Sequence, residues 1–436
     1  MGSKDAAVLP LRGAKTVGGS PGKEALGAVF LTAAAFGCGG SQPTQPQPLA
    51  SPAIPPEGYV RLAFNESPFG PPPCAQTAME EMLSRPYAMD GADPDFMPGI
   101  NRYPDFLNVT VSNRIAARHG VSSGQVIACC GFSELAYMCS QAFLPTGKHL
   151  LMPELSYRLP AFYAQQCGKG VHTARMDSAH GIDLMAMLEE VDPDTGLIYL
   201  ANPNNPTGSL LALDDLESFL SLAARKSPEA VFLIDEAYVD YVQQSPAPEA
   251  IPLCTRFRAV VGRTFSKAFG LAGLRAGYAI AGSELGLELN GFLSGYLGGD
   301  TGWRMFEGNI NRLAESAVLA SLSGEGLAFV ESVRTRNADL RDLLDRGLSG
   351  FGFDPLPSHA NFMLVDVKSR GENLRRCLFG RKILVQAGES FHSSLRNCIR
   401  VSVGSRDEID AFLEALAAYD PARAYPECLP VFYHGI

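Results

Sequence analysis

Residues 262–277 have the sequence GRTFSKAFGLAGLRAG, and they continue directly from the short apolar run Arg258–Gly262. A short apolar run that ends at a glycine is typical of a buried strand. The segment after it is rich in glycine and carries Lys267 close to its start. The stretch therefore predicts a buried strand that opens into a polar, glycine-rich loop with a lysine inside it.

Similar apolar runs alternate with amphipathic helical patterns from about Ser123 onward. The other runs that predict buried strands are Gln125–Cys130, His149–Met152, Gly196–Ala201 and Ala230–Ile234. The patterns that predict helices between them include Glu134–Phe143 and Asp214–Ala224. Strands that alternate with helices predict a mostly parallel sheet, in which ligands bind beyond the carboxyl ends of the strands. Polar clusters occur at these ends, after Cys130, Ala201, Ile234 and Gly262.

The C-terminal part of the chain predicts a second, smaller α+β domain. A long helical pattern starts after Gly324, and it is followed by the strand-like runs Asn361–Val367 and Cys398–Val403 and by the helix Asp407–Ala417. We therefore expect five parts. They are a flexible leader with a Pro-rich linker at 1–58, an N-terminal arm that joins the smaller domain at 59–100, a large domain at 101–325, the smaller domain at 326–418 and a tail at 419–436.

The composition limits the class of protein. The chain has 436 residues, enough for two domains, and its 46% hydrophobic and 19% charged residues are ordinary for a globular protein. The net charge of -10 argues against a nucleic-acid binder, because neutralising phosphates needs a basic face. None of the ten cysteines forms a Cys-x-x-Cys pair, so we predict no metal site and expect free thiols in a reducing compartment.

The first 58 residues differ from the rest in composition. Basic residues precede the apolar run Ala25–Phe36, and a Pro-rich stretch extends from Gln42 to Pro56. The apolar run is too short to span a membrane, which needs ~20 residues. The segment resembles a secretory signal, with a loose similarity to a lipoprotein cleavage box at Ala35–Cys38, and the alternative is a disordered leader. We expect a cytoplasmic protein, or an exported or membrane-anchored one if the leader is a signal.

The loop after Gly262 carries the candidate chemistry. An aldehyde cofactor forms a Schiff base with a lysine amine, and a desolvated lysine such as Lys267 would supply it. A phosphate on the cofactor needs hydroxyls and a guanidinium, which Thr264, Ser266 and Arg275 offer. For the Ser-Lys pair alone, the favoured alternative would be a surface lysine beside a Ser/Thr loop.

Asp235 closes the apolar strand Val231–Ile234, and Tyr238 follows three residues later. A carboxylate at a buried strand end costs several kcal/mol unless it is paired. A protonated pyridine nitrogen is a suitable partner, and Tyr238 could then bond the phenolic oxygen of the same ring. The alternative is that Asp235 caps a following helix.

Three other segments that follow predicted strands each have a functional and a structural interpretation. Asn205, in the segment Asn202–Gly208, could donate to the same phenolic oxygen, or the segment could be a plain turn. Backbone N–H groups near Ser133 would hold a phosphate at a helix N-terminus, Ser133 would simply cap that helix, or both would apply. Tyr157 could stack on a planar ring or pack in the core.

Taken together, these strings resemble the fold-type I enzymes that use pyridoxal 5′-phosphate (PLP), and among them the class I and II aminotransferases. They are most similar to the histidinol-phosphate aminotransferase branch. The resemblance covers about Tyr59 to Ala418, and it includes the strings Asn65–Pro71, Asn101–Asp105 and Cys398–Glu408. It implies an α/β fold with a large PLP-binding domain on a mostly parallel sheet of the seven-stranded type, and a smaller α+β domain.

The resemblance also implies roles for the cofactor contacts. Lys267 would bind PLP covalently and move the α-proton of the substrate, and Asp235 would pair with the ring nitrogen. Asn205 and Tyr238 would hold the phenolic oxygen, and Tyr157 would stack on the ring. The implied phosphate contacts are Phe132, Ser133, Thr264, Ser266 and Arg275, together with Tyr103 reaching across from a second subunit.

On the substrate side, the resemblance implies that Arg400 clamps the α-carboxylate and that Asn65 lies beside the substrate. The contact from Tyr103 implies a homodimer with shared active sites. The implied substrates are an amino acid and a 2-oxo acid.

One departure from that branch concerns the substrate. In the branch an arginine usually follows the Ile-x-Val strand of the smaller domain and grips the phosphate of histidinol phosphate, but here Gln386 follows Ile383–Val385. Glutamine cannot offer a charge-assisted fork to a dianion, and losing such a contact costs ~2 kcal/mol or more. We therefore expect a substrate other than histidinol phosphate.

A second departure is the stretch Ser84–Gly99, an insertion that contains Asp90, Asp93 and Asp95. An acidic loop at the mouth of the active site would select a cationic or guanidinium-bearing substrate. The alternative is a solvated surface loop.

Three classes of function follow. The leading hypothesis is transamination between an L-amino acid and a 2-oxo acid. A PLP-dependent lyase, cyclase or decarboxylase of specialised metabolism would use the same cofactor contacts, because the cofactor carries the difficult chemistry. The third is a non-catalytic regulator, which the retention of every cofactor contact disfavours.

Overall fold

The computed structural model describes residues 58–84, 99–104, 108–296 and 310–426, with residues 290–296 described by their backbone alone. The predicted leader and linker lie outside the described residues except for Gly58, and so do the last ten residues of the predicted tail. The acidic part of the predicted insertion, with Asp90, Asp93 and Asp95, also lies outside them.

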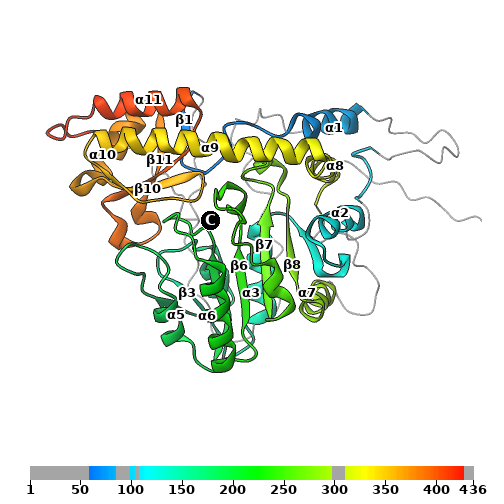
Figure 1. Cartoon of the computed structure of the whole chain (residues 1–436). Helices are drawn as coiled ribbons and strands as arrows, with labels where there is room; N and C mark the ends of the chain where they lie inside the picture. The colour runs from blue at the N-terminus through cyan, green and yellow to red at the C-terminus, as the bar shows by residue number, and fades with distance from the viewer. Residues whose placement is uncertain (1–57, 85–98, 105–107, 297–309, 427–436) are drawn as a thin grey trace, which may run out of the picture. The chain divides into compact units, whose positions relative to one another are not determined.

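A seven-stranded sheet forms the centre of the larger part of the fold (Figure 1). The strands lie in the order β2 (Val126–Cys129), β8 (Gly277–Ala281), β7 (Ala259–Thr264), β6 (Val231–Asp235), β5 (Thr195–Ala201), β3 (His149–Pro153) and β4 (Gly170–Ala174). Strand β8 is antiparallel to both of its neighbours, and every other neighbouring pair is parallel. The prediction of an α/β fold on a mostly parallel seven-stranded sheet is therefore confirmed.

The five strands predicted from the apolar runs of this region correspond to β2, β3, β5, β6 and β7. The sequence pattern missed β4 and β8. Strand β4 is a half-exposed edge strand with a mixed polar sequence, so it has no continuous apolar run. Strand β8 follows the glycine-rich loop almost at once, and that loop hides where the strand begins.

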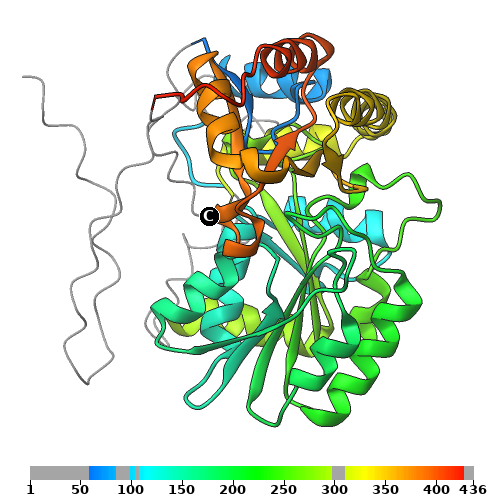
Figure 2. The same ribbon diagram turned by 90° about the vertical axis from the view of Figure 1, so that its left-hand side faces the viewer.

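Helices cover both faces of this sheet (Figure 2). Side chains of a strand alternate between the faces, so in β6 Val231 and Leu233 pack on one side while Phe232 and Ile234 pack on the other. The first side is covered by α3 (Phe132–Phe143), α4 (Leu159–Gln166) and α7 (Ser283–Tyr296). The second side is covered by α2 (Val109–His119), α5 (Leu184–Glu190), α6 (Leu213–Lys226) and α8 (Arg312–Ser321).

A second, five-stranded sheet has the order β1 (Val60–Leu62), β11 (Ile383–Ala387), β12 (Cys398–Ser402), β10 (Phe362–Asp366) and β9 (Asp354–Pro355). It packs with α9 (Gly324–Gly350), α10 (Gly371–Gly380) and α11 (Arg406–Ala417) around a core of its own. The first strand of the described chain therefore pairs with a strand more than 300 residues later, and it does so in parallel. The short helix α1 (Pro73–Ser84) packs against α8.

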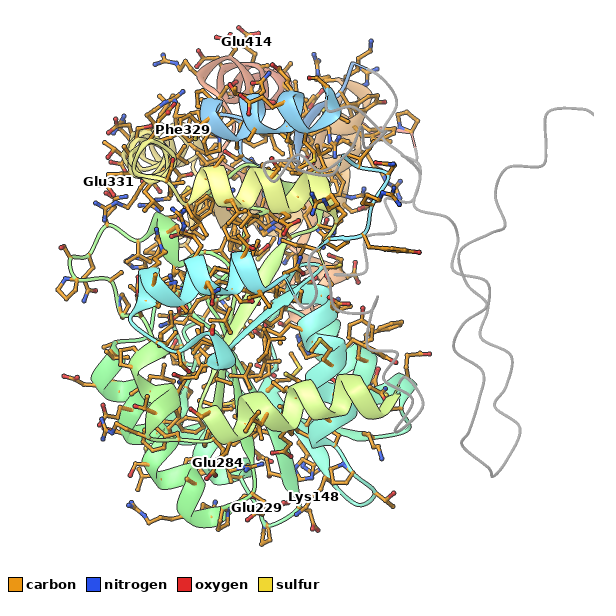
Figure 3. The ribbon with its side chains drawn as sticks, turned by 90° about the vertical axis from the view of Figure 1, so that its right-hand side faces the viewer. Lys148, Glu229, Glu284, Phe329, Glu331 and Glu414 are labelled. Atoms are coloured by element: carbon orange, nitrogen blue, oxygen red, sulfur yellow. The ribbon has the colours of Figure 1, made fainter. Side chains whose placement is uncertain are left out.

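The large sheet is oriented with the carboxyl ends of its parallel strands toward the smaller sheet. Lys148, directly before β3, and Glu229, just before β6, lie at one end of the molecule, and Glu414 on α11 lies at the opposite end (Figure 3). Among the described residues, no single helix is both long and apolar enough to cross a membrane, although the pair α8 and α9, bent by 78°, passes that test by length and composition.

At Gly270 the loop that carries Lys267 packs directly against the backbone of the N-terminal segment at Gly70. Its φ of +66° lies in the left-handed region, and a Cβ added there would overlap the carbonyl oxygen of Gly70. Gly273, three residues later, has open space around the same position and no positive φ. Only the first of these two glycines therefore fixes how closely the two segments approach.

We predict that Gly270→Ala destabilises the protein by about 2 kcal/mol or more, because left-handed strain adds to a clash with backbone. The matched control Gly273→Ala should leave stability nearly unchanged. Thermal unfolding of the two variants beside the parent measures the difference. Equal melting temperatures for Gly270→Ala and Gly273→Ala would contradict the packing described here.

Candidate active site

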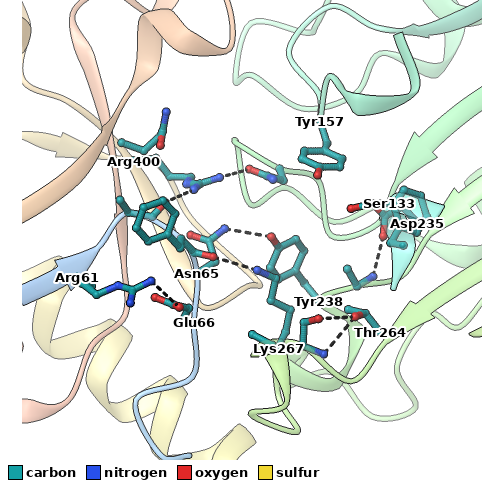
Figure 4. A pocket seen from close by; sticks show the side chains of 18 of the residues that line it. Arg61, Asn65, Glu66, Ser133, Tyr157, Asp235, Tyr238, Thr264, Lys267 and Arg400 are labelled. Carbon is teal, nitrogen blue, oxygen red and sulfur yellow. Dashed lines mark hydrogen bonds and ion pairs between the residues drawn. The ribbon is translucent and has the colours of Figure 1, made fainter. Parts of the chain in front are cut away.

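A cavity of about 370 Å³ lies at the carboxyl ends of the parallel strands, and residues of the smaller sheet form its other wall. Thirteen of the fourteen predicted site residues line it: Asn65, Phe132, Ser133, Tyr157, Asn205, Asp235, Tyr238, Thr264, Ser266, Lys267, Arg275, Gln386 and Arg400. Figure 4 shows Lys267 beside Tyr238, with Arg400 approaching from one side and Ser133 and Asp235 from the other. Positions spread over more than 330 residues of sequence thus meet in one pocket.

Lys267 lies in the loop after β7 and is largely enclosed. Its Nζ donates a hydrogen bond of 3.0 Å to the carbonyl oxygen of Phe64. Burial, and then the positive charge of Arg400, lower the pKa of Lys267 to about 8. Because the neutral amine is the nucleophile, this lysine is far better prepared for attack on an aldehyde near neutral pH than an exposed lysine.

Asp235 ends β6 on the side of the sheet covered by α3, and it is buried. Its Oδ2 accepts from the Tyr199 hydroxyl at 3.0 Å, and its Oδ1 accepts from the backbone N–H of Ala237 at 2.9 Å. Burial raises the pKa of Asp235 to about 7, against the lowering effect of these hydrogen bonds. The alternative that Asp235 caps a following helix is wrong, because the short 3₁₀ helix Val239–Tyr241 has Tyr238 at its cap position. The bond to Ala237 spans only two residues.

Strand alternation explains why the neighbours of Asp235 do not crowd the cavity. Glu236 points to the other side of the sheet, where it accepts from Arg263 at 2.7 Å. Arg263 immediately precedes Thr264, which in turn lines the cavity. The buried ion pair and the cavity thus lie on opposite faces of the same two strand ends.

The N-terminus of α3 and the loop after β7 form a cradle for an anion. Thr264 donates to Ser266 at 2.9 Å, and the Arg275 guanidinium donates to Ser266 at 3.3 Å. Gly131 caps α3 with a φ of +84°, and a Cβ on it would lie 2.8 Å from the Arg275 guanidinium. The interpretation of Ser133 as the helix cap is wrong, because Gly131 takes that position and leaves the Ser133 side chain on the cavity.

Arg400, on β12, is buried at the opposite wall. Its guanidinium donates to Asn205 Oδ1 and to the carbonyl oxygen of Ala63, both at 2.6 Å. It lies over the rings of Phe362 and Phe391, at 5.3 and 5.0 Å. Burial lowers the pKa of Arg400 to about 10, so it stays charged near neutral pH. A fixed buried guanidinium of this kind suits a carboxylate of a bound ligand.

Asn65 connects the N-terminal segment to the cavity. It has a left-handed φ of 55°, and its Nδ2 donates to the Tyr238 hydroxyl at 3.0 Å. Its Oδ1 accepts from Ser402 at 3.0 Å. Asn65 therefore bonds Tyr238, and Tyr238 is one of the two residues predicted to contact the phenolic oxygen.

Tyr103 is the one predicted site residue that does not line the cavity. It is 71% exposed, in the short described segment 99–104. The role assigned to it required a second subunit, so its position in one chain neither supports nor opposes that role.

Several residues of the cavity were not found from the sequence. Arg61 and Glu66 form a half-exposed ion pair of 2.9 Å at its edge, and Phe391 contributes an aromatic wall. Glu66 lies in the string Asn65–Pro71, which is part of the family resemblance and could have indicated that Glu66 is near the site. Tyr199, which bonds Asp235 but does not line the cavity, had no signal in the sequence, because a tyrosine inside an apolar run is most often a core residue.

The described residues contain one cluster that could hold a metal ion, His149, His172 and Asp192, with ligand atoms within 4.8 Å of one another. The two imidazole rings stack face to face, with centroids 3.8 Å apart and planes 20° apart. Nearly parallel rings direct their nitrogen lone pairs along nearly parallel planes, so the rings as they stand do not converge on one ion. His149 opens β3, so the cluster is at the end of the sheet away from the cavity.

The cavity fits PLP. The enclosed amine of Lys267 suits the aldehyde, and the cradle of α3, Ser266 and Arg275 suits the phosphate. Asp235 is a buried carboxylate whose ionised form needs a cationic partner, and a protonated ring nitrogen would be one. Gly131 lies close to the Arg275 guanidinium, and a side chain at position 131 would press against that guanidinium. The glycine therefore keeps the space beside Arg275 open for an anion.

Comparisons with known proteins agree with this fit. The family model described as aminotransferase class I and II matches residues 57–416. The chain is 32% identical over 364 residues to histidinol-phosphate aminotransferase 2 of Methylococcus capsulatus, covering 82% of this chain and 89% of that protein. It is 30% identical over 360 residues to histidinol-phosphate aminotransferase of Moorella thermoacetica, covering 82% of this chain and 84% of that protein.

Solved structures are similar in fold. The histidinol-phosphate aminotransferase from Sinorhizobium meliloti, in complex with PLP, superposes with a TM-score of 0.68 at 24% identity, over 82% of this chain and 89% of that one. A mutant aspartate aminotransferase of Thermus thermophilus gives 0.66 at 20% identity, over 82% and 95%. The family match, the relatives and the cavity lead to one conclusion: the chain belongs to the class I and II aminotransferases, PLP-dependent enzymes of fold type I, and it resembles the histidinol-phosphate aminotransferase branch.

Proposed function

We propose that this aminotransferase moves the α-amino group of a non-phosphorylated L-amino acid to a 2-oxo acid. The observation that carries the proposal is Gln386. It is a neutral, buried side chain paired in register with Arg400, at the position where the branch pattern has an arginine for the substrate's phosphate.

PLP supplies an aldehyde that bonds to amines and a ring that withdraws electrons from the substrate's α-carbon. Lys267 would hold it, and its amine, with a pKa lowered to about 8, would take the α-proton and return it. Asp235 would face the ring nitrogen, and Tyr238 and Asn205 the phenolic oxygen. Tyr157 would cover the ring, and the phosphate would lie in the cradle formed by Phe132, Ser133, Thr264, Ser266 and Arg275.

Arg400 would bind the α-carboxylate of both substrates. Its bonds to Asn205 and to the Ala63 carbonyl fix the guanidinium, and Nε has no hydrogen-bond partner among the described residues. A donor already held in place loses little entropy when a carboxylate arrives. The same clamp therefore serves an amino acid in one half of the reaction and a 2-oxo acid in the other.

The side chain of the substrate would meet Gln386, Arg61 and Glu66. Gln386 donates to Ser390 at 2.6 Å, and Arg61 and Glu66 neutralise each other. This wall has hydrogen-bonding groups but little net charge, whereas a phosphate dianion is bound best by charge-assisted forks. The names of the relatives favour histidinol phosphate, and position 386 argues against it.

The proposal is tested with a panel of L-amino acids and histidinol phosphate as amino donors, with 2-oxoglutarate as acceptor and glutamate formation as the readout. We expect one or more non-phosphorylated donors to exceed histidinol phosphate in kcat/KM. Gln386→Arg should raise kcat/KM for histidinol phosphate about tenfold or more, because a charge-assisted bond replaces a neutral one. Gln243→Arg, the same change at an exposed position, is the control.

Histidinol phosphate as the best donor of the parent enzyme would refute the proposal. Arginine belongs in the panel, because the predicted acidic insertion would favour a guanidinium. An amino acid that is consumed without glutamate, with release of carbon dioxide or ammonia, would favour the lyase or decarboxylase alternative.

We also propose that two copies of the chain share their active sites, with Tyr103 reaching the phosphate in the other copy. Tyr103 is 71% exposed in the single chain. The exposed apolar residues Ile100 and Val109 flank it along the chain, which supports a covered surface in this region.

A mixing experiment tests the shared site. Lys267→Ala lacks the covalent attachment and Tyr103→Ala lacks the phosphate contact, so each alone should have little activity. After the two are unfolded and refolded together, each mixed dimer would contain one site with both side chains intact, and activity should return. Activity of the mixture equal to the sum of the separate variants would rule out the shared arrangement.

A further inference from the structure

We propose that Tyr199 is a positioning residue for the cofactor, whose hydroxyl holds the Asp235 carboxylate ionised and directed at the ring nitrogen. The inference rests on the role proposed above for Asp235, and it adds a residue that lines no cavity. By its place inside an apolar strand, Tyr199 would otherwise be a core residue.

Tyr199 lies in the middle of β5, the strand next to β6, and it is completely buried. The two strands are parallel, and their register pairs Ala201 with Asp235 and Tyr199 with Leu233. Tyr199 therefore starts one pleat behind Asp235 on the same face of the sheet, and its side chain is long enough to reach forward to the carboxylate.

The carboxylate of Asp235 receives one donor on each oxygen. The Tyr199 hydroxyl donates to Oδ2 at 3.0 Å, and the Ala237 backbone N–H donates to Oδ1 at 2.9 Å. Two donors, one from the neighbouring strand β5 and one from the turn directly after β6, prevent the carboxylate from rotating. Asp235 also lines the cavity, so a carboxylate held this way has a fixed face for a cofactor.

The Tyr199 hydroxyl acts as a hydrogen-bond donor to Asp235 and keeps its proton. Burial and the neighbouring Asp235 raise the pKa of Tyr199 well above its usual value, so it remains a protonated donor. Burial, and after it the charge of Glu236, raise the pKa of Asp235. The bonds from Ala237 and Tyr199 and the charge of Lys267 lower it. Donors to the ionised form favour that form. Without the hydroxyl, more of the carboxylate would be protonated near neutral pH, and it would pair less well with a cationic ring nitrogen.

Packing does not require the hydroxyl. Tyr199 packs against Phe132 on α3, with ring centroids 6.2 Å apart, and a phenylalanine would keep that contact. A buried hydroxyl that lacked a partner would cost stability. The oxygen is therefore explained by Asp235, and Tyr199→Phe removes that one interaction with little change in shape.

The test compares two cofactors that differ only at the ring nitrogen. Cofactor-free protein is titrated with PLP and with 1-deazapyridoxal 5′-phosphate, in which CH replaces the nitrogen, and dissociation constants are measured by equilibrium dialysis. Tyr199→Phe should weaken PLP binding about tenfold or more, by analogy with other hydrogen bonds to charged groups, and leave binding of the deaza compound nearly unchanged.

The matched control is Tyr278→Phe. Tyr278 lies on β8 of the same sheet, it is also buried, and its hydroxyl bonds His119 at 2.9 Å on the face away from the cavity. This variant should not change the preference for PLP over the deaza compound. Melting temperatures of both variants establish that they are folded.

The variant Asp235→Asn distinguishes a failure of the role proposed for Tyr199 from a failure of the role proposed for Asp235. If Asp235→Asn lowers the preference for PLP and Tyr199→Phe does not, Tyr199 is not a positioning residue. If neither variant lowers it, the role of Asp235 itself is wrong. Equal weakening of both compounds by Tyr199→Phe would also overturn the proposal, because it would mean that only packing was disturbed.

Discussion

The main constraint on this structure is that one enclosed cavity contains several ionisable side chains. Lys267 and Asp235 lie at the ends of adjacent strands, and Arg400 lies on the opposite wall. A buried charge costs several kcal/mol unless it is paired or hydrogen-bonded. Parallel strands solve part of this problem, because they bring several chain segments to one edge of the sheet where backbone and side-chain donors converge. The rest is solved by the second sheet, which brings Arg400 and Asn65 over that edge. The site therefore requires both sheets, and neither would hold these groups alone.

Much of this could be predicted from short strings, because each polar cluster directly follows an apolar run and the runs are strands of one sheet. For that reason ten of the predicted residues that line the cavity lie at or after strand ends of the large sheet. The other three, Asn65, Gln386 and Arg400, come from the smaller sheet and the segment after β1. What the sequence could not provide was pairing between distant segments. Tyr199 touches Asp235 only because β5 and β6 are neighbours in a particular register, and Arg61 reaches the cavity only because β1 pairs with β11. The sequence offered Ser133 as a possible helix cap because serine is a common cap, whereas the close approach of Arg275 favours Gly131 at that position.

Cofactor and substrate are specified by different parts of the molecule. The residues suited to PLP come from the large sheet and its loops, where distances and burial are set by strand geometry. The groups that would meet the substrate's side chain, Gln386 and the pair Arg61 and Glu66, come from the smaller sheet and the segment after β1. A chain can therefore keep its cofactor contacts while the wall that meets the substrate's side chain changes, and our proposal for Gln386 depends on this separation.

The central claim is that the amine of Lys267 captures the cofactor. Its most direct test is to incubate the protein with PLP at several pH values, reduce with sodium borohydride, digest, and locate the added mass by mass spectrometry. The account predicts the label on the peptide that contains Lys267, with initial capture increasing as the pH rises through about 8, where the amine loses its proton. Labelling spread over other lysines, or undiminished in Lys267→Ala, would contradict it.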